Sequence, residues 1–593
     1  ETWSVRELKS DAGTPLDARF SKDGSQVACV RDGELYVIDV ASGVEKRLTN
    51  DAGEGVTNAL AEFVAQEEMD RDHGYWWSPD GSQIAYQQTD TAGMEVFHIA
   101  DAFDPANSPQ EWPYPRAGKK NAEVRLGVIS AQGGETQWVE WDREAYPYLA
   151  TVKWVKGAPL TILVQNRAQT EEMLLEVDPA SGSTRTLLVE RDPAWINLFQ
   201  KAPYWLKDGS AFLWLTERNG FTELELRGRD GGLVRTIAGR DIGLVDLVGV
   251  SEDAGVVYAI GSVHPTQKHI WRIPLSASTG PMLRMSNEPG VFGATLSEDG
   301  SAFVESGSTM SGREFWMVRR EDGYRAGALR SVAERPNFEP RVELVTVEAE
   351  GRELHAAVVR PRDFEHGKKY PVIASVYGGP HKQVVTAARM DYTLAQWIAD
   401  HGYIVVSVDG RGTPARGRAW ERAIKGELID PALDDQVAGI EALGKRFEEM
   451  DLERVGVFGW SFGGYFSAMA VMRKPELFRA GVAGAPVCDW RDYDTHYTER
   501  YMGLLPESEA AYDQCSVLSY CDELEVPLLI IHGTADDNVY MVNSLRMADA
   551  LFRAGKEFEF LPLGGATHMV REPEMIEQLY ARIMEFFERS MAE

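Results

Sequence analysis

The sequence predicts two domains of different fold class, an all-β propeller over residues 1–336 and an α/β domain over residues 337–593. Three observations lead to this prediction: the chain length, a short phrase repeated in the first part, and a change of hydrophobic pattern near Pro336. At 593 residues the chain is too long for a single hydrophobic core, so two or more domains are expected.

The repeated phrase marks tight turns between strands. Asp-Gly supplies the positive φ that a hairpin turn requires, and alternating apolar residues follow each copy. The phrase occurs at 21–24, 78–81, 206–209 and 297–300, with a looser copy at 251–255. The last three copies are 45 and 46 residues apart (208 to 253, 253 to 299), which is the spacing of propeller blades. We predict seven or eight blades, with insertions between residues 90 and 200; an array of β-sandwiches is the structural alternative.

Beyond Pro336, short apolar runs alternate with helical patterns. Runs buried on both faces are typical of parallel strands. They occupy residues 372–376, 404–408, 454–458 and 528–531. An amphipathic stretch at 543–554 ends before Gly555, the expected helix cap. The first residues of the chain are expected either within the propeller or packed on this α/β domain.

The composition excludes some classes of partner. The formal charge is −31, and such a polyanion repels nucleic acid phosphates and anionic membrane surfaces. Hydrophobic residues make up 44% and charged residues 26%, as in soluble globular proteins. The sequence contains no run of roughly 18 apolar residues, so no membrane span is expected.

The cysteines and the first residue bear on the compartment. Cys29, Cys488, Cys515 and Cys521 form neither a disulfide framework nor a zinc pattern, although Cys515 and Cys521 are close enough in sequence to be bridged or to be two buried thiols. The chain begins at Glu1 without a signal segment, so either a leader was removed or the chain was trimmed. The first case slightly favours a periplasmic or secreted location over the cytoplasm.

A serine in the second half has the context of a catalytic nucleophile. Residues 459–463, Gly-Trp-Ser-Phe-Gly, fit the G-x-S-x-G elbow of α/β-hydrolases. Chance matches to three fixed positions are common, but here an apolar strand ends at Phe458 and a helical stretch covers 464–472. We therefore predict that Ser461 is the nucleophile of an α/β-hydrolase domain, which needs a base to take its proton.

The acid and the base of a triad are expected after the serine, because the chain order in this fold is serine, acid, histidine. Asp536 follows the apolar run at 528–531, and His568 is the only one of the 11 histidines that comes after it. Asp537 is the rival for the acid, and His532 is expected to order the loop. The alternative for His568 is a loop histidine without a catalytic role.

The oxyanion of such a reaction needs two donors. The backbone N–H of Phe462, directly after the nucleophile, is expected to be one. Tyr377, in Val-Tyr-Gly-Gly-Pro after the run at 372–376, could supply the other. The residues alone leave this open, because tyrosines after strands are usually packing residues. No metal or cofactor is indicated.

With these motifs in place, the chain resembles the dipeptidyl peptidase IV family of prolyl-oligopeptidase-type serine peptidases over nearly its whole length. Residues 459–464 read GWSFGG where the family has GWSYGG, so Phe462 replaces a tyrosine whose backbone does the work. Residues 532–539, HGTADDNV, look like the family's acid loop and imply that Asp536 is the acid. Tyr377 matches the family's oxyanion tyrosine.

The resemblance also implies a proline pocket. Residues 486–501 are similar to the segment that lines it in the family. The implied apolar walls are Val487, Trp490, Tyr493, Tyr497 and Val539. A pyrrolidine ring offers no N–H, so it must be selected by shape and aromatic contact. Without the resemblance, such an aromatic cluster is more often part of a core.

A third segment resembles the family's Glu-Glu helix. Residues 63–71, followed by Tyr75-Trp76-Trp77, imply that Glu67 and Glu68 bind the free amino group of a substrate. An ammonium between two carboxylates relieves their repulsion. Alone, the pair would be a solvated helix face. Asn538 maps to a family residue that holds a substrate carbonyl, residues 113–119 resemble a structural propeller motif, and the family's propeller arginine has no assignable counterpart.

The resemblance implies a cofactor-free serine exopeptidase. It would release N-terminal X-Pro, and less well X-Ala, dipeptides from peptides with a free N-terminus, and it would be a homodimer. The rivals that keep the triad are a prolyl tripeptidyl peptidase and an acylaminoacyl-peptidase or oligopeptidase. The rival of a different class is a non-catalytic propeller binding protein.

Overall fold

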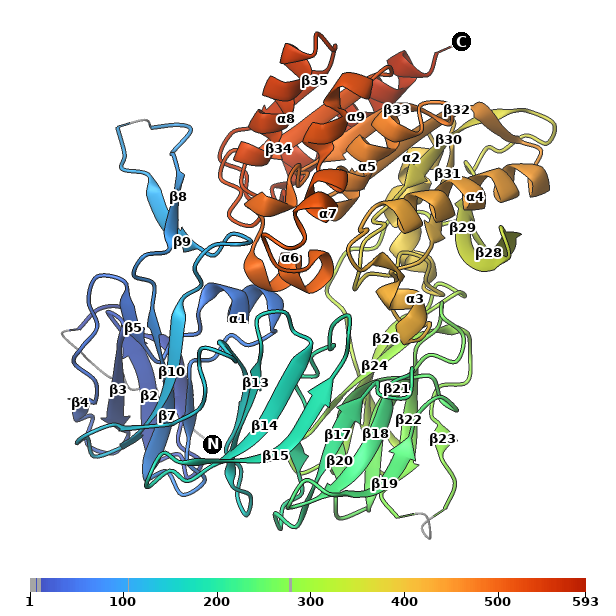
Figure 1. The fold of residues 1–593 in the computed structure, drawn as a ribbon. Coiled ribbons are helices and arrows are strands. Elements are labelled where there is room, and N and C mark those ends of the chain that lie inside the picture. The colour runs from blue at the N-terminus through green and yellow to red at the C-terminus, as the bar shows by residue number, and fades with distance from the viewer. Residues whose placement is uncertain (1–6, 8–11, 105, 277–279, 593) are drawn as a thin grey trace.

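The computed structural model describes residue 7 and residues 12–104, 106–276 and 280–592. Figure 1 shows the N-terminal sheets arranged side by side in the lower half of the molecule, with the C-terminal α/β sheet above them. The expected packing of the first residues on the α/β domain falls mostly outside the described residues. The last propeller strand ends at Leu329 and the α/β sheet begins at Val342, so a boundary near Pro336 stays a prediction.

The described N-terminal residues form six antiparallel sheets of four or five strands that follow one another along the chain, and a separate two-stranded hairpin. The first sheet contains β1 (Leu16–Phe20), β2 (Gln26–Arg31), β3 (Glu34–Asp39) and β4 (Glu45–Arg47). The second contains β5 (Val56–Asn58), β6 (Tyr75–Trp77), β7 (Gln83–Asp90), β10 (Glu123–Ser130) and β11 (Gln137–Trp138). The third contains β12 (Tyr148–Lys153), β13 (Leu160–Gln165), β14 (Glu171–Val177) and β15 (Thr184–Arg191). The fourth contains β16 (Tyr204–Trp205), β17 (Ala211–Thr216), β18 (Glu223–Gly228) and β19 (Leu233–Ala238). The fifth contains β20 (Leu244–Ser251), β21 (Val256–Gly261), β22 (His269–Pro274) and β23 (Leu283–Arg284). The sixth contains β24 (Gly290–Leu296), β25 (Ala302–Thr309), β26 (Glu314–Arg320) and β27 (Arg325–Leu329).

This part of the chain is a β-propeller, but the predicted count of seven or eight blades is wrong for the described residues, which form six. The expected insertion accounts for part of the difference. Residues 91–122 project as a hairpin of β8 (Glu95–Ile99) and β9 (Gln110–Tyr114), hereafter the arm, and make no blade (Figure 1).

The repeated phrase lies where the first two strands of a blade meet. Gly24, Gly81, Gly209 and Gly300 have φ between 65° and 74°, in the left-handed region that favours glycine. The third blade has Gly157 at this turn without the Asp-Gly phrase, so the repeated phrase does not mark that blade in the sequence. An ion pair of 3.0 Å between Lys22 and Glu298 joins the turns of the first and last described blades.

The C-terminal part is an eight-stranded sheet in the order β28-β29-β31-β30-β32-β33-β34-β35. The pairs β28–β29 and β29–β31 are antiparallel. Every pair from β31–β30 onward is parallel. The strands are β28 (Val342–Ala349), β29 (Arg352–Val359), β30 (Tyr370–Ser375), β31 (Ile404–Asp409), β32 (Met450–Trp460), β33 (Phe478–Gly484), β34 (Leu528–Gly533) and β35 (Glu559–Leu563).

Helices cover both faces of this sheet. In the central strand β30, Val372 and Ala374 face one core cluster and Ile373 faces the other, as the period of two requires. Helices α4 (Asp430–Arg446), α5 (Phe462–Arg473) and α8 (Val542–Arg553) pack into the first cluster. Helices α2 (Thr393–Ala399) and α9 (Pro573–Ser590) pack into the second. This is the predicted α/β-hydrolase architecture.

The shorter helices lie outside these layers. They are α1 (Phe63–Glu68), α3 (Arg418–Glu421), α6 (Thr495–Met502) and α7 (Glu509–Gln514), with the 3-10 turns η2 (Arg389–Tyr392), η3 (Arg422–Ile424), η4 (Trp490–Asp492) and η5 (Val517–Glu523). None of the helices in the described part of the chain is long and apolar enough to cross a membrane.

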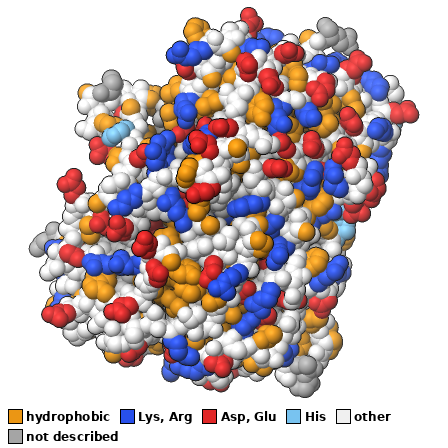
Figure 2. All heavy atoms as spheres, viewed as in Figure 1, with side chains coloured by type: hydrophobic (Ala, Val, Ile, Leu, Met, Phe, Trp, Pro, Cys, Tyr) orange, Lys and Arg blue, Asp and Glu red, His pale blue; other side chains and the backbone are white. Residues whose placement is uncertain are grey.

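The surface and the cysteines match the composition. Figure 2 shows acidic and basic side chains interspersed over the viewed face, with apolar side chains between them. All four cysteines are buried free thiols, so Cys515 and Cys521 are not bridged. Burial raises the pKa of Cys515 to about 11, which keeps that thiol protonated near neutrality.

Candidate active site

Ser461 occupies a strained turn between β32 and α5. Its φ of 60° and ψ of −120° lie outside the regions that residues with a side chain prefer. Its N–H donates to the carbonyl of Gly484 at 2.8 Å, which fixes the turn. A Cβ on Gly459 would meet the carbonyl of Gly463, and one on Gly464 would meet that of Gly484, so both positions require glycine. The helix begins at Phe462, two residues earlier than the sequence predicted.

His568 and Asp536 lie side by side beyond the ends of β35 and β34. Nδ1 of His568 is 2.8 Å from Oδ2 of Asp536. Asp536 is buried, and burial alone would raise the pKa of its carboxyl. Hydrogen bonds from His532 and His568 outweigh burial and lower that pKa, so the carboxylate stays ionised next to the imidazole. This is the arrangement that orients a base for proton transfer.

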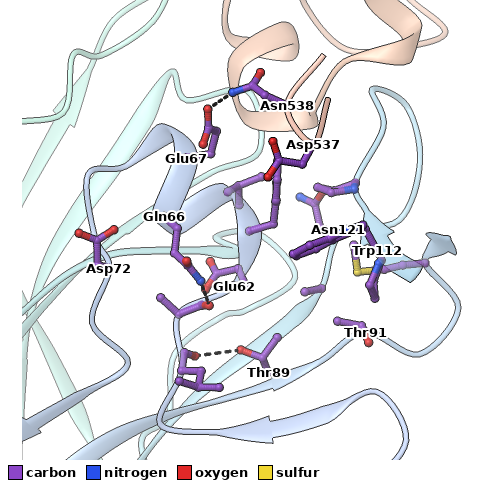
Figure 3. Close-up of a pocket in the computed structure, with 18 of the residues that line it drawn as sticks. Glu62, Gln66, Glu67, Asp72, Thr89, Thr91, Trp112, Asn121, Asp537 and Asn538 are labelled. Atoms are coloured by element: carbon purple, nitrogen blue, oxygen red, sulfur yellow. Dashed lines mark hydrogen bonds between the residues drawn. The ribbon is translucent and has the colours of Figure 1, made fainter. Parts of the chain in front are cut away.

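The other residues of the acid loop have separate places. The second oxygen of Asp536, Oδ1, accepts the N–H groups of Asn538 at 3.0 Å and Val539 at 2.9 Å. His532 contacts Ser544 Oγ with Nδ1 and the carbonyl of Val539 with Nε2, both at 2.7 Å, and therefore orders the loop. The rival acid Asp537 instead lines a cavity (Figure 3).

The side chains of the two residues expected to supply the oxyanion donors are neighbours. The N–H of Phe462 belongs to the first turn of α5, where backbone donors have no helical partner. Tyr377 follows β30, and its ring centroid is 5.8 Å from that of Phe462. Burial, with a smaller contribution from Glu68, raises the pKa of Tyr377 to about 12, so its hydroxyl remains a donor across the physiological range.

The five residues of the expected proline pocket are all at most 9% exposed and belong to one buried cluster. The rings of Trp490 and Tyr497 are stacked at 5.7 Å and 14°, and Tyr493 meets Tyr497 edge to face at 5.3 Å. The hydroxyl of Tyr493 donates to Asn538 Oδ1 at 2.8 Å. Val487 and Val539 complete the cluster. These side chains come from η4, α6 and the loops around them.

Glu67 and Glu68 end helix α1, which the propeller inserts toward the α/β domain (Figure 1). The carboxylate of Glu67 accepts a hydrogen bond from the side-chain amide of Asn538, as Figure 3 shows. Burial is the main cause that raises the pKa of both carboxyls, more strongly for Glu68. The Arg71 guanidinium donates to the carbonyl of His73 at 2.7 Å and to Gln87 Oε1 at 2.7 Å, which fixes the chain after the helix.

The sequence analysis did not single out Asp494. It is fully buried, it caps α6 by accepting the N–H of Tyr497 at 3.0 Å, and its carboxyl lies against that of Glu68. Among the described residues its Oδ2 has no hydrogen-bond partner, and burial, followed by the nearby Asp494, raises the pKa of the Glu68 carboxyl. Burial raises the pKa of Asp494 to about 6. The only signal in the sequence is its capping position before Thr495.

Contacts between the two domains hold η4 and α6 in place. Arg116 of the propeller, in the segment 113–119, forms an ion pair with Asp492 at 2.6 Å, and Arg167 forms one with Glu499 at 2.7 Å. Gln169 accepts from Arg500 at 2.5 Å. The segment 113–119 thus has a structural role, as expected. Among the described residues, no group of three or more His, Cys, Asp or Glu side chains is arranged to hold a metal ion.

Two family models match this chain, and together they cover most of it. The model described as "Dipeptidyl peptidase IV (DPP IV) N-terminal region" matches residues 1–311. The model of the prolyl oligopeptidase family matches residues 389–593. The chain belongs to the dipeptidyl peptidase IV family. It is therefore a serine peptidase, as the sequence predicted.

Relatives of this family resemble the chain over almost its full length. Dipeptidyl peptidase 8 of Mus musculus is 26% identical over 96% of this chain and 75% of its own. The probable dipeptidyl peptidase 4 of Aspergillus fumigatus is 28% identical over 94% of this chain and 76% of its own. The crystal structure of Porphyromonas gingivalis dipeptidyl peptidase 4 superposes with a TM-score of 0.91 at 27% identity, covering 98% of this chain and 84% of that one.

Proposed function

We propose that this dipeptidyl peptidase IV family member releases N-terminal dipeptides whose second residue is proline, or less well alanine, from peptides with a free amino terminus. The observation that carries the proposal is the contact between Glu67 and Asn538. It brings a carboxylate of the propeller to the loop of Asp536, so an acidic site for the substrate amine lies within a short peptide's reach of the triad.

In the proposed reaction, Ser461 Oγ attacks the carbonyl carbon of the second residue while His568 takes the hydroxyl proton. The Phe462 N–H and the Tyr377 hydroxyl donate to the oxyanion that forms. When the peptide bond breaks, His568 returns the proton to the departing nitrogen of the third residue. A water molecule then repeats the sequence on the acyl-enzyme, with Asp536 holding the imidazole throughout.

The aromatic pocket supports the choice of proline. Trp490, Tyr493 and Tyr497 form an apolar aromatic cluster, and a proline ring, which has no N–H to satisfy, is recognised by such apolar contact. The ammonium of the first residue would lie between Glu67 and Glu68, while Asn538 holds the first carbonyl. The acidic pair then fixes the number of residues between the terminus and the cleaved bond.

The test compares initial rates on Gly-Pro-p-nitroanilide with those on its N-acetylated form. We expect kcat/KM to fall at least about 100-fold on acetylation, because the charge that Glu67 and Glu68 bind is removed. Equal rates would leave a serine peptidase of the oligopeptidase or acylaminoacyl type. A preference for an X-X-Pro over an X-Pro reporter would indicate a tripeptidyl peptidase, and failure of a fluorophosphonate to label the protein would indicate a binding protein.

We also propose that the protein is a homodimer that pairs through α8. Val542, Leu545 and Phe552 lie on one face of this helix and are 41%, 49% and 77% exposed, an apolar stripe that a second copy would cover. We expect light scattering to give twice the 66.0 kDa chain mass for the wild type and a single chain mass for Phe552→Glu. Phe20→Glu, a change at a 64% exposed propeller residue, is the control. A wild-type protein of one chain mass would contradict the proposal.

A further inference from the structure

A cavity of about 900 Å³ lies beside the proposed triad, between the arm and the loops of the α/β domain. Met94 and Trp112 of the arm line one side, and Met569, next to His568, lines another. Glu67 and His568 themselves reach its wall. In Figure 3, Trp112 lies on the arm side of this space, and Glu67 and Asn538 lie on the opposite side. None of the five residues of the expected proline pocket lines this cavity.

The course of the substrate through this site follows from the proton transfer. His568 must come within hydrogen-bond reach of the departing nitrogen, and this nitrogen belongs to the third residue of the peptide. The first residue is held at Glu67 and Glu68, and the second fills the aromatic pocket. The third and later residues therefore start in front of the His568 ring, whose side chain is 16% exposed and faces the cavity.

The cavity also has the chemical character of a binding site. Trp112 is 41% exposed and Met569 is 56% exposed, so two large apolar side chains border it without being covered by the rest of the chain. Its volume is within the range of about 300–1,000 Å³ that is typical of ligand pockets. When an apolar ligand group covers exposed apolar surface in a concave site, the free energy of binding becomes more favourable.

We propose that this cavity binds the part of the peptide that follows the cleaved bond, and that Trp112 and Met569 select aromatic or aliphatic side chains at the third and fourth positions. This inference rests on the proposed function, because it takes the direction of the substrate from it. The arm would thus be a determinant of specificity for the leaving peptide.

The test compares kcat/KM for Gly-Pro-Leu-Phe-amide and Gly-Pro-Ala-Ala-amide, with the released dipeptide amide measured by chromatography. We expect the wild type to prefer the first peptide about tenfold or more, since apolar side-chain differences of this size give discrimination of that order in a pocket. Trp112→Ala is expected to reduce this preference to about twofold or less. Trp112→Phe, which keeps an aromatic face, is expected to retain most of it.

Two further variants make the result decisive. Trp316→Ala removes a tryptophan of similar exposure, 39%, from the propeller strand β26, and it is expected to keep the wild-type preference. Met569→Ala reports on the opposite wall and is expected to lower the preference even if Trp112→Ala does not fold. A wild type that cuts both peptides equally, or a Trp112→Ala enzyme with the full preference, would overturn this inference alone. A wild type that cuts neither peptide would overturn the proposed function as well.

Discussion

Replacing Ser461 by alanine is expected to lower kcat on Gly-Pro-p-nitroanilide on the order of 10⁶-fold, because the nucleophile of a catalytic triad acts together with its base and acid. The strained backbone at this position stays the same, since alanine and serine have similar conformational preferences at φ 60°. The melting temperature should therefore remain close to that of the wild type. Initial rates at saturating substrate, with circular dichroism of both proteins, measure the two quantities.

The matched control is Ser467→Ala, a serine of α5 six residues after Ser461. Its hydroxyl donates to the carbonyl of Gly463 at 2.7 Å, and it is fully buried. Loss of one neutral hydrogen bond costs about 1 kcal/mol, so any effect on kcat should stay below about tenfold. A Ser461→Ala enzyme within tenfold of the wild type, or one still labelled by a fluorophosphonate, would rule out Ser461 as the nucleophile.

The second large effect is expected at Glu68. Glu68→Gln keeps the size of the side chain but removes the charge that would face the substrate ammonium, so kcat/KM for Gly-Pro-p-nitroanilide should fall about 100-fold or more. The rate on the N-acetylated substrate should stay at its low wild-type level, because that substrate has no charge to lose. The difference in kcat/KM between the free and the N-acetylated substrate should therefore nearly vanish in the variant.

Glu135→Gln serves as the control for the change of charge. Glu135 is an exposed propeller glutamate, and its replacement should alter neither rate by more than about twofold. If Glu68→Gln reduces both rates equally, the residue supports the fold of the site instead of binding the amine. If it reduces neither, the ammonium is bound elsewhere and the exopeptidase proposal loses its anchor.

Much of the fold was predictable because local signals were strong. The Asp-Gly turns and the parallel-strand runs marked a propeller and an α/β-hydrolase domain, and both are present. The number of blades was not predictable by the same route. The third described blade turns at Gly157 without the phrase, and the arm takes up residues that a fixed period assigns to strands. Counting turns therefore says little about a repeat whose units vary.

The candidate site shows a similar division. Chain order singled out His568, the resemblance of residues 532–539 implied Asp536 over Asp537, and His568 and Asp536 are 2.8 Å apart. The carboxyl of Asp494 was missed because its neighbour Glu68 lies more than 400 residues earlier in the chain, and only the docking of α1 on α6 brings them together. Side chains that act through contacts between domains leave little pattern in a single sequence.

The two oxygens of Asp536 serve different parts of the loop: one meets His568, and the other holds the N–H groups of Asn538 and Val539. One carboxylate therefore links proton transfer to the shape of the surface that would receive the substrate. A substitution of Asp536 is therefore expected to change turnover and selectivity together. The loop from His532 to Val539 thus works as one mechanical part, since catalysis and recognition share the same support.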